Sequence, residues 1–453
     1  MTRVVRNGRL VTPGGVTKGD ISFRNGVIEG IGRRLRGETI ADVKGAWVLP
    51  GAVDPHLHIS LGGHSITEPL LHDLHQAARA ALRGGVTTIG VYAQRTPVAT
   101  VAESVEAEIA REREGVAADY FINALLLPGD DIEGTVARSA EMGVTSFKTM
   151  VAYASRGQML DDASICLLME RAAAVGGVTL VHAENGGAID YLDAVERRRG
   201  VTNASYLRSQ PAELEFEGMN RTAMFSILTG CRLHFVHCTS SQGAELLGGL
   251  KYSGASVTAE TQIHYLLLTN EEVLRRGPLG KVGPPLRDAD HLPGLWEALA
   301  DGRIDHLSSD HSPKSLKVKL AAENILDATF GGIAGTGVML PLAFSEGFKK
   351  GRLTIRQVAE VTSTRAAQIY GIYPQKGVLA EGSDADLVVI PERQPEVPLT
   401  HDLLAPEAGY SLFESLSTNG MPSLVIRGGS VVLSDGELVG PENGRYLARS
   451  GPP

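Results

Sequence analysis

The sequence of 453 residues predicts an α/β protein: a (β/α)8 barrel joined to a small β-sandwich domain formed from both termini. Three observations predict this fold. Strand-like segments with tight turns occur at both ends of the chain. Between them, short apolar segments alternate with longer helical ones. Several of the apolar segments also end in a side chain that can bind a metal ion.

The two ends of the chain share the same β-rich character. Residues 4–8 and 21–26 both end in Asn-Gly, which is typical of a tight turn between antiparallel strands. Residues 385–390 and 423–429 are strand-like and are bounded by glycine-rich turns. The alternative is that the two ends are unrelated β extensions.

The middle of the chain contains eight candidate strands. They are residues 51–58, 86–91, 120–126, 146–150, 178–182, 233–238, 256–260 and 304–310. Helical patterns lie between most of them, for example at 161–174, 213–228 and 291–300. Eight β/α units over roughly 260 residues match the size of a TIM-like barrel. An open, doubly wound sheet is the alternative, but no GxGxxG motif follows a strand to support it.

These patterns divide the chain into four parts. We predict a first sandwich part at 1–50, the barrel at 51–372, a second sandwich part at 373–440 and a C-terminal arm on the surface at 441–453.

Composition excludes several classes of function. With 43 Lys and Arg against 52 Asp and Glu, the net charge of −9 argues against a nucleic-acid binder and against adhesion to an acidic membrane face. No apolar run approaches the roughly 18 residues that a membrane span needs. Three cysteines without CxxC spacing argue against a disulfide framework. We therefore expect a soluble, cytoplasmic protein with no nucleic-acid or membrane partner.

The strand ends carry the candidate metal ligands. His56 and His58 are two residues apart on one strand, so both imidazoles point to the same face. Further strands carry Lys148, His182, His237 and Asp310 near their carboxyl ends. In a (β/α)8 barrel these ends surround the active site, so the spacing predicts that all six side chains meet at one mouth.

Each of these signals also has a purely structural interpretation. A single strand-end histidine is more often a hydrogen-bonded structural residue, which is how we interpret His234 and His306. An aspartate can cap a helix, and a lysine usually extends to water. The metal site is predicted because all five strand ends agree.

Four imidazoles and a carboxylate suit zinc or a similar divalent ion, and they are too many for one tetrahedral ion with an open position. We therefore expect two Zn²⁺, or other divalent ions, about 3.5–4 Å apart with a bridging ligand. A lysine amine cannot bridge, but Lys148 carbamylated by carbon dioxide presents two oxygens. A metal-bridged hydroxide would be the nucleophile, and Asp310 would take its proton and return it to a leaving nitrogen.

Residues 51–58 (GAVDPHLH) resemble the opening signature of the amidohydrolase superfamily. Within that superfamily, the sequence is similar to the branch of cyclic amidohydrolases that contains hydantoinase and dihydropyrimidinase. Further stretches resemble other motifs of that branch: 146–153 (SFKTMVAY), 181–185 (VHAEN), 235–240 (FVHCTS) and 308–313 (SSDHSP). The resemblance implies that one metal is held by His56, His58, Lys148 and Asp310, and the other by Lys148, His182 and His237. It also implies a homo-oligomer, a tetramer or a dimer.

The resemblance further implies hydrolysis of the C–N bond of a neutral cyclic amide, a hydantoin or a dihydropyrimidine. Tyr153 would donate its hydroxyl to the oxyanion, although an aromatic packed at the barrel mouth is the structural alternative. Dihydroorotase-like relatives have an arginine where this chain has Ser60, which cannot pair with a substrate carboxylate. Gly283, Gly331 and His64 are the remaining candidates for substrate binding.

Other activities remain open. Gly283 and Gly331 replace a serine and an asparagine common in the family, which leaves an allantoinase-type or cyclic-imide-type hydrolase as the alternative. A mononuclear deaminase of the same superfamily would lack the bridging lysine. A non-catalytic scaffold relative would have lost ligands, whereas all six positions are filled here.

Overall fold

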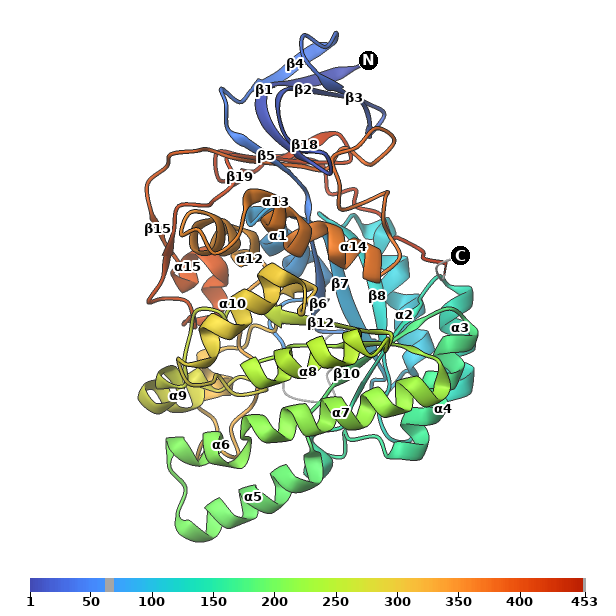
Figure 1. Cartoon of the computed structure of the whole chain (residues 1–453), viewed down its shortest axis with the longest axis vertical. Coiled ribbons are helices and arrows are strands. Elements are labelled where there is room, and N and C mark those ends of the chain that lie inside the picture. Colours follow the sequence, from blue (N-terminus) through green and yellow to red (C-terminus); the bar gives the residue numbers. More distant parts are fainter. Residues whose placement is uncertain (62–68, 451–453) are drawn as a thin grey trace.

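The computed structural model describes residues 1–61 and 69–450 and contains a nearly closed barrel of eight parallel strands (Figure 1). The strands are neighbours in chain order: β6 (Ala52–Leu57), β7 (Val86–Gln94), β8 (Asp119–Leu125), β9 (Ser146–Met150), β10 (Val178–His182), β11 (Arg232–Phe235), β12 (Val257–Gln262) and β13 (His306–Ser308). All eight predicted strands and the predicted barrel are confirmed.

The first and last strands of the barrel meet just beyond the end of β13. Leu57 pairs with His311 in a parallel bridge, and the backbone N–H of His58 donates to the His311 carbonyl at 2.8 Å. The strands are short and almost entirely buried, because helices cover their outer face and side chains fill the barrel. Because both faces of each strand are buried, the strand sequences are continuous apolar runs.

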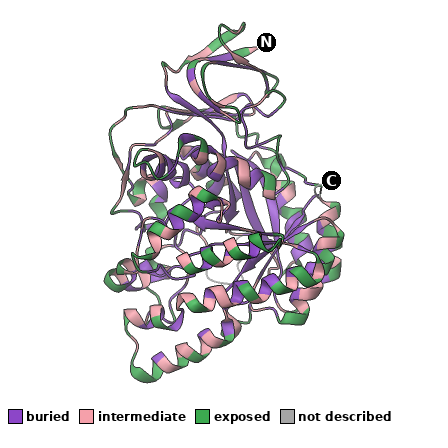
Figure 2. Ribbon diagram, in the orientation of Figure 1, coloured by how far each residue is buried: buried purple, intermediate pink, exposed green. Residues whose placement is uncertain are grey.

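Helices follow the strands and surround the barrel with their apolar faces inward (Figure 2). Those of ten or more residues are α1 (Leu74–Arg83), α2 (Val101–Ala110), α3 (Ile132–Glu141), α4 (Asp162–Ala174), α5 (Gly186–Arg199), α7 (Ala212–Thr229), α8 (Ser241–Tyr252) and α10 (His291–Asp301). Shorter ones are α6 (Asn203–Ser209), α9 (Glu271–Arg276), α11 (Leu316–Lys319), α12 (Met339–Leu342), α13 (Ile355–Ala359), α14 (Arg365–Ile369) and α15 (His401–Leu404). The three helices predicted above match α4, α7 and α10. None of the helices in the described part of the chain is long and apolar enough to cross a membrane.

Strands from both ends of the chain form one mixed sheet beside the barrel. The N-terminal strands are β1 (Arg3–Thr12), β2 (Gly15–Arg24), β3 (Val27–Gly32), β4 (Glu38–Asp42) and β5 (Trp47–Pro50). The C-terminal strands are β14 (Leu387–Ile390), β17 (Leu424–Arg427), β18 (Ser430–Ser434) and β19 (Glu437–Leu438), and β14 pairs with β5. A separate two-stranded sheet pairs β15 (Val397–Pro398) with β16 (Ser417–Thr418). The large sheet has an apolar core of its own, so the prediction of a small β domain built from both ends is confirmed.

One of the two predicted tight turns is wrong. Asn25-Gly26 does join β2 to β3, but Asn7-Gly8 lies inside β1. There Asn7 has a φ of 60°, and the pairing with β2 shifts register between Val5 and Gly8, as in a β-bulge. The strand continues because residues 9–12 keep pairing with β2 beyond the bulge.

The predicted surface position of the C-terminal arm holds for Arg445 and Ala448, which are exposed, but is wrong for Gly444, Leu447 and Arg449, which are buried. The backbone N–H of Leu447 donates to the Tyr120 carbonyl at 2.7 Å. Arg449 is buried and donates to Ser146 Oγ at 2.9 Å and to the Ile122 carbonyl. The segment therefore covers the amino-terminal end of the barrel, opposite the mouth, where the guanidinium finds acceptors at the first residue of β9 and within β8.

Candidate metal centre

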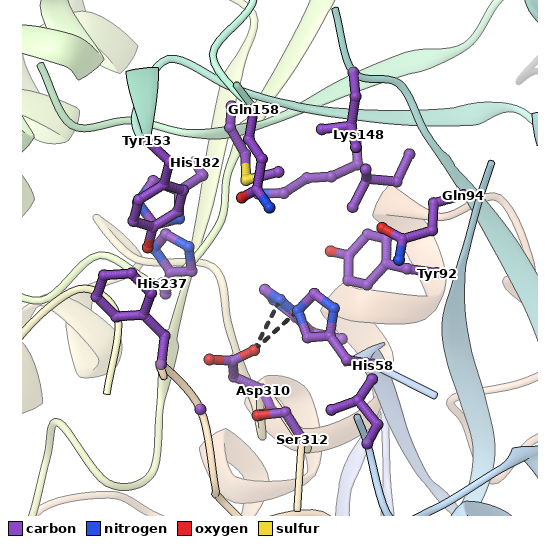
Figure 3. A pocket seen from close by; sticks show the side chains of 18 of the residues that line it. His58, Tyr92, Gln94, Lys148, Tyr153, Gln158, His182, His237, Asp310 and Ser312 are labelled. Atoms are coloured by element: carbon purple, nitrogen blue, oxygen red, sulfur yellow. Dashed lines mark hydrogen bonds and ion pairs between the residues drawn. The ribbon is translucent and has the colours of Figure 1, made fainter. Parts of the chain in front are cut away.

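All six predicted ligands line one pocket at the carboxyl ends of the barrel strands. Figure 3 shows Tyr153, His182 and His237 on one side of the pocket and His58 on the other, with Lys148 and Asp310 at opposite edges. The barrel alone brings these residues together, because neighbouring parallel strands end at the same rim.

The first group consists of His56, His58 and Asp310. The Nε2 atoms of His56 and His58 each lie 3.2 Å from Asp310 Oδ1. Burial by itself would lower the pKa of His56, but the charges of Glu260 and Asp310 outweigh it and raise the pKa to about 9. Burial opposes ionisation of Asp310 too, yet the charge of His56 and the hydrogen bonds from both histidines hold its pKa below the usual range. The ionised carboxylate of Asp310 therefore stabilises a positive charge next to it, which in this structure is the protonated imidazole of His56.

The second group consists of His182 and His237. Their ring centroids lie 4.2 Å apart in an edge-to-face arrangement, and His182 Nε2 lies 2.7 Å from Glu184 Oε2. Burial lowers the pKa of both imidazoles, so they are neutral at physiological pH. A neutral imidazole is the form that binds a metal ion, and the contact with Glu184 leaves Nδ1 of His182 as its ligand atom.

Lys148 lies between the two groups on β9. Its Nζ atom is buried and has no hydrogen-bond partner among the residues that the structure describes. Burial lowers the pKa of Lys148 to about 7, against the opposing charges of Glu260 and Asp310. The side chain is therefore poised to lose its proton near neutral pH, which is what carbamylation of the amine requires.

Three residues of the pocket hold the backbone in the left-handed region. The φ angles are 43° at His237, 51° at Asp310 and 63° at Tyr153. Such angles are uncommon outside glycine and often mark functional sites, where the surrounding structure imposes them. Here each turns a side chain into the pocket immediately beyond a strand.

Three of the four predicted substrate-binding residues lie in the pocket, and the fourth is outside the described residues. Tyr153, Gly283 and Gly331 line the pocket, a cavity of about 140 Å³. A Cβ at Gly283 would lie 2.7 Å from the Tyr153 hydroxyl, so glycine leaves room for this phenol. His64 lies outside the described residues.

Sequence reasoning missed two acidic residues that support the ligands. Glu260 contacts His56, and Glu184 contacts His182. The seventh predicted strand ended at Glu260, and this was the available signal, because a carboxylate in a buried strand needs partners. His234 and His306 are buried and hydrogen-bonded through Nδ1 to Thr258 Oγ1 and to the Leu307 carbonyl, as the structural interpretation expected.

These residues fit a pair of divalent ions. Four imidazoles, an ionised carboxylate and a buried lysine with no hydrogen-bond partner among the described residues form a donor set that suits zinc and related ions. The three ligand atoms of His56, His58 and Asp310 lie within 4.8 Å of one another.

Comparison with known proteins agrees with this chemistry. Residues 47–432 match the model of the Amidohydrolase family. The chain is 31% identical to a D-hydantoinase of Geobacillus stearothermophilus, over 99% of this chain and 97% of the relative. It is 32% identical to an allantoinase of Rubrobacter xylanophilus, over 98% and 97%. Among solved structures, a D-hydantoinase from Thermus sp. has a TM-score of 0.92 at 28% identity, with 99% of each chain covered.

Zinc uptake by the metal-free protein is expected to depend on pH through Lys148. Carbon dioxide reacts with the free amine, and a pKa of about 7 means that the amine fraction rises roughly tenfold between pH 6 and pH 8. At a fixed concentration of dissolved carbon dioxide, we expect the rate of stable zinc incorporation to be about tenfold lower at pH 6 than at pH 8. Metal analysis of samples taken over time measures this rate. In Lys148→Ala, uptake should no longer respond to carbon dioxide; a parent protein equally indifferent to carbon dioxide would contradict the carbamate.

Proposed function

Because the chain belongs to the amidohydrolase family, we propose that this metal-dependent cyclic amidohydrolase opens the C–N amide bond of a hydantoin or a dihydropyrimidine. The observation that carries the proposal is the convergence of six ligand side chains and Tyr153 on one small cavity. At about 140 Å³ the cavity is well below the roughly 300–1,000 Å³ of pockets for drug-sized ligands, so it suits a small ring.

We infer that one ion is held by His56, His58, Lys148 and Asp310, and the other by Lys148, His182 and His237. Lys148, as a carbamate, would join the two. Divalent ions bound there would polarise the ring carbonyl and make water a nucleophile at neutral pH. Zinc is the ion we propose, from the predominance of imidazole ligands.

Asp310 is proposed as the general base and acid. The depressed pKa of its carboxyl keeps it ionised at neutral pH, and it lies at the edge of the cavity. It takes the proton of the attacking water as the new C–O bond forms at the ring carbonyl. When the C–N bond breaks, Asp310 returns that proton to the leaving nitrogen, so protons balance within one turnover.

Tyr153 is proposed to stabilise the oxyanion. Burial raises the pKa of its phenol well above the usual value, so the hydroxyl keeps its proton and remains a hydrogen-bond donor. Contacts with the rings of His182 and Phe330, at 4.8 and 4.9 Å between centroids, hold the phenol in place. The donor is thus positioned before substrate binds.

A second candidate substrate class is allantoin and the simple cyclic imides. Relatives named allantoinase are as similar to the chain as those named hydantoinase, so overall likeness does not separate the two. Tyr153 favours the hydantoin or dihydropyrimidine, since the resemblance implies that allantoinases generally lack this tyrosine. The sequence argument for an uncharged ring is that Ser60 stands where dihydroorotase-like relatives have a carboxylate-binding arginine.

We also propose that the enzyme is a homo-oligomer, a tetramer or a dimer. Met224, Ile227 and Leu228 of α7 are exposed, and a cluster of exposed apolar side chains is typical of a subunit contact.

A turnover panel tests the substrate class. It would compare hydantoin, 5-substituted hydantoins, dihydrouracil, allantoin, dihydroorotate and simple cyclic imides, with zinc, manganese or cobalt supplied. We expect the highest kcat/KM with the neutral hydantoins or dihydrouracil. Dihydroorotate as the best substrate would contradict the neutral-ring proposal, and turnover of none of these rings would contradict the activity.

Tyr153→Phe should lower kcat by about 10²–10³-fold, as expected for loss of one oxyanion donor. The zinc content should stay at two per chain, because the phenol is not among the proposed ligands. Steady-state kinetics and metal analysis on the same preparation would check both. A rate equal to that of the parent would reduce Tyr153 to a packing residue.

A further inference from the structure

Glu260 is a carboxylate buried inside the barrel, beneath the proposed metal centre. It belongs to β12, is fully buried, and contacts side chains from three other strands. Its Oε1 atom lies 2.5 Å from Nδ1 of His56 and accepts a hydrogen bond from the Gln262 amide at 3.0 Å. This oxygen is therefore committed to His56 and to a neighbour on its own strand.

The other oxygen faces a pair of stacked histidines. Oε2 of Glu260 lies 3.5 Å from Nε2 of His234 and 3.8 Å from Nε2 of His306. The two rings are parallel within 3°, with centroids 5.1 Å apart. Thr258 Oγ1 can donate to Nδ1 of His234, which leaves the N–H of that ring on the Nε2 that faces the carboxylate. Nδ1 of His306 donates its N–H to the Leu307 carbonyl, so His306 only packs against His234.

We propose that Glu260 is a positioning residue that fixes the ring and the tautomer of His56, and that His234 holds the carboxylate in place from its other side. The proposal rests on the proposed function, since His56 is there a metal ligand. It assigns a role to two buried residues that the ligand set does not use.

The chemistry follows from the form of His56 that binds a metal ion, a neutral imidazole with a single N–H. A carboxylate at Nδ1 keeps the proton on that nitrogen, so Nε2 presents its lone pair toward His58 and Asp310. Burying a carboxylate is costly unless donors surround it, and here the imidazoles of His56 and His234 and the Gln262 amide lie around it. An apolar side chain would fill this space at lower cost, which argues against a role in packing alone.

The effect should be confined to one of the two ions. Glu260 contacts His56, whereas His182 on the far side has its own carboxylate, Glu184, at 2.7 Å. Weakening Glu260 should therefore loosen the ion held with His58 and Asp310 and leave the ion at His182 and His237 unaffected. A general loss of stability would instead weaken both.

Glu260→Gln removes the charge and keeps the shape. Its amide nitrogen can donate to Nδ1 of His56 and force the proton onto Nε2, and its oxygen is a weaker acceptor than a carboxylate. In zinc titrations of the full chain against a competing chelator, we expect one of two equivalents to bind about 10–100-fold more weakly, with the other unchanged. Glu260→Asp, which keeps the charge, should recover part of the loss.

Glu108→Gln is the matched control. Glu108 is also a buried glutamate, but it lies on α2 and does not line the pocket. Both zinc affinities should equal those of the parent. His234→Gln, which alters the donor to Oε2 alone, should weaken the same equivalent as Glu260→Gln, but by less.

Equal zinc affinities in Glu260→Gln and the parent would overturn this inference and leave the proposed function intact. A parent that binds no zinc would overturn the proposed function itself. Should Glu260→Gln fail to fold, Glu260→Asp decides: selective weakening of one equivalent supports the role, and two unchanged affinities overturn it. A third zinc that only His234→Gln loses would also overturn it, because His234 and Glu260 would then be ligands.

Discussion

The closure of the barrel is the constraint on which the site depends. The backbone N–H of His311 donates to the His56 carbonyl at 3.3 Å, and His58 N–H donates back to the His311 carbonyl at 2.8 Å. These main-chain bonds join the first strand to the segment beyond the last, and Asp310 precedes that junction. The HxH pair therefore meets the carboxylate only when all six intervening strands lie in register. The same bonds that complete the fold bring together His56, His58 and Asp310, the first group of the candidate metal centre.

Burial then sets the protonation states that the chemistry needs. Removal from water neutralises His182 and His237 and brings the pKa of Lys148 close to neutrality, while Asp310 stays ionised because histidines donate to it. The buried carboxylates Glu260 and Glu184 each contact one ligand histidine. The candidate centre thus consists of proposed ligands on the pocket wall and carboxylates behind them, and both layers are carried by the barrel strands or by the residues directly beyond them.

Much of this arrangement could be predicted from the sequence, because parallel barrel strands are buried on both faces and read as short apolar runs. The ligands follow from the ends of those runs, since the fold sends every such end to one rim. What escaped prediction depends on long-range contacts. Nothing local distinguishes a bulge at Asn7-Gly8 from a turn, and the covering of the barrel floor by Arg449 depends on acceptors more than 300 positions away. Glu260 was visible at a strand end, but its partner His56 lies 204 positions earlier.

The most direct test of the central claim is anomalous diffraction at the zinc edge from crystals grown with zinc and bicarbonate. The account predicts two peaks about 3.5–4 Å apart, with electron density for a carbamate on Lys148 between them. One peak beside His56 and His58, with an unmodified Lys148, would contradict a centre in which this lysine joins two ions.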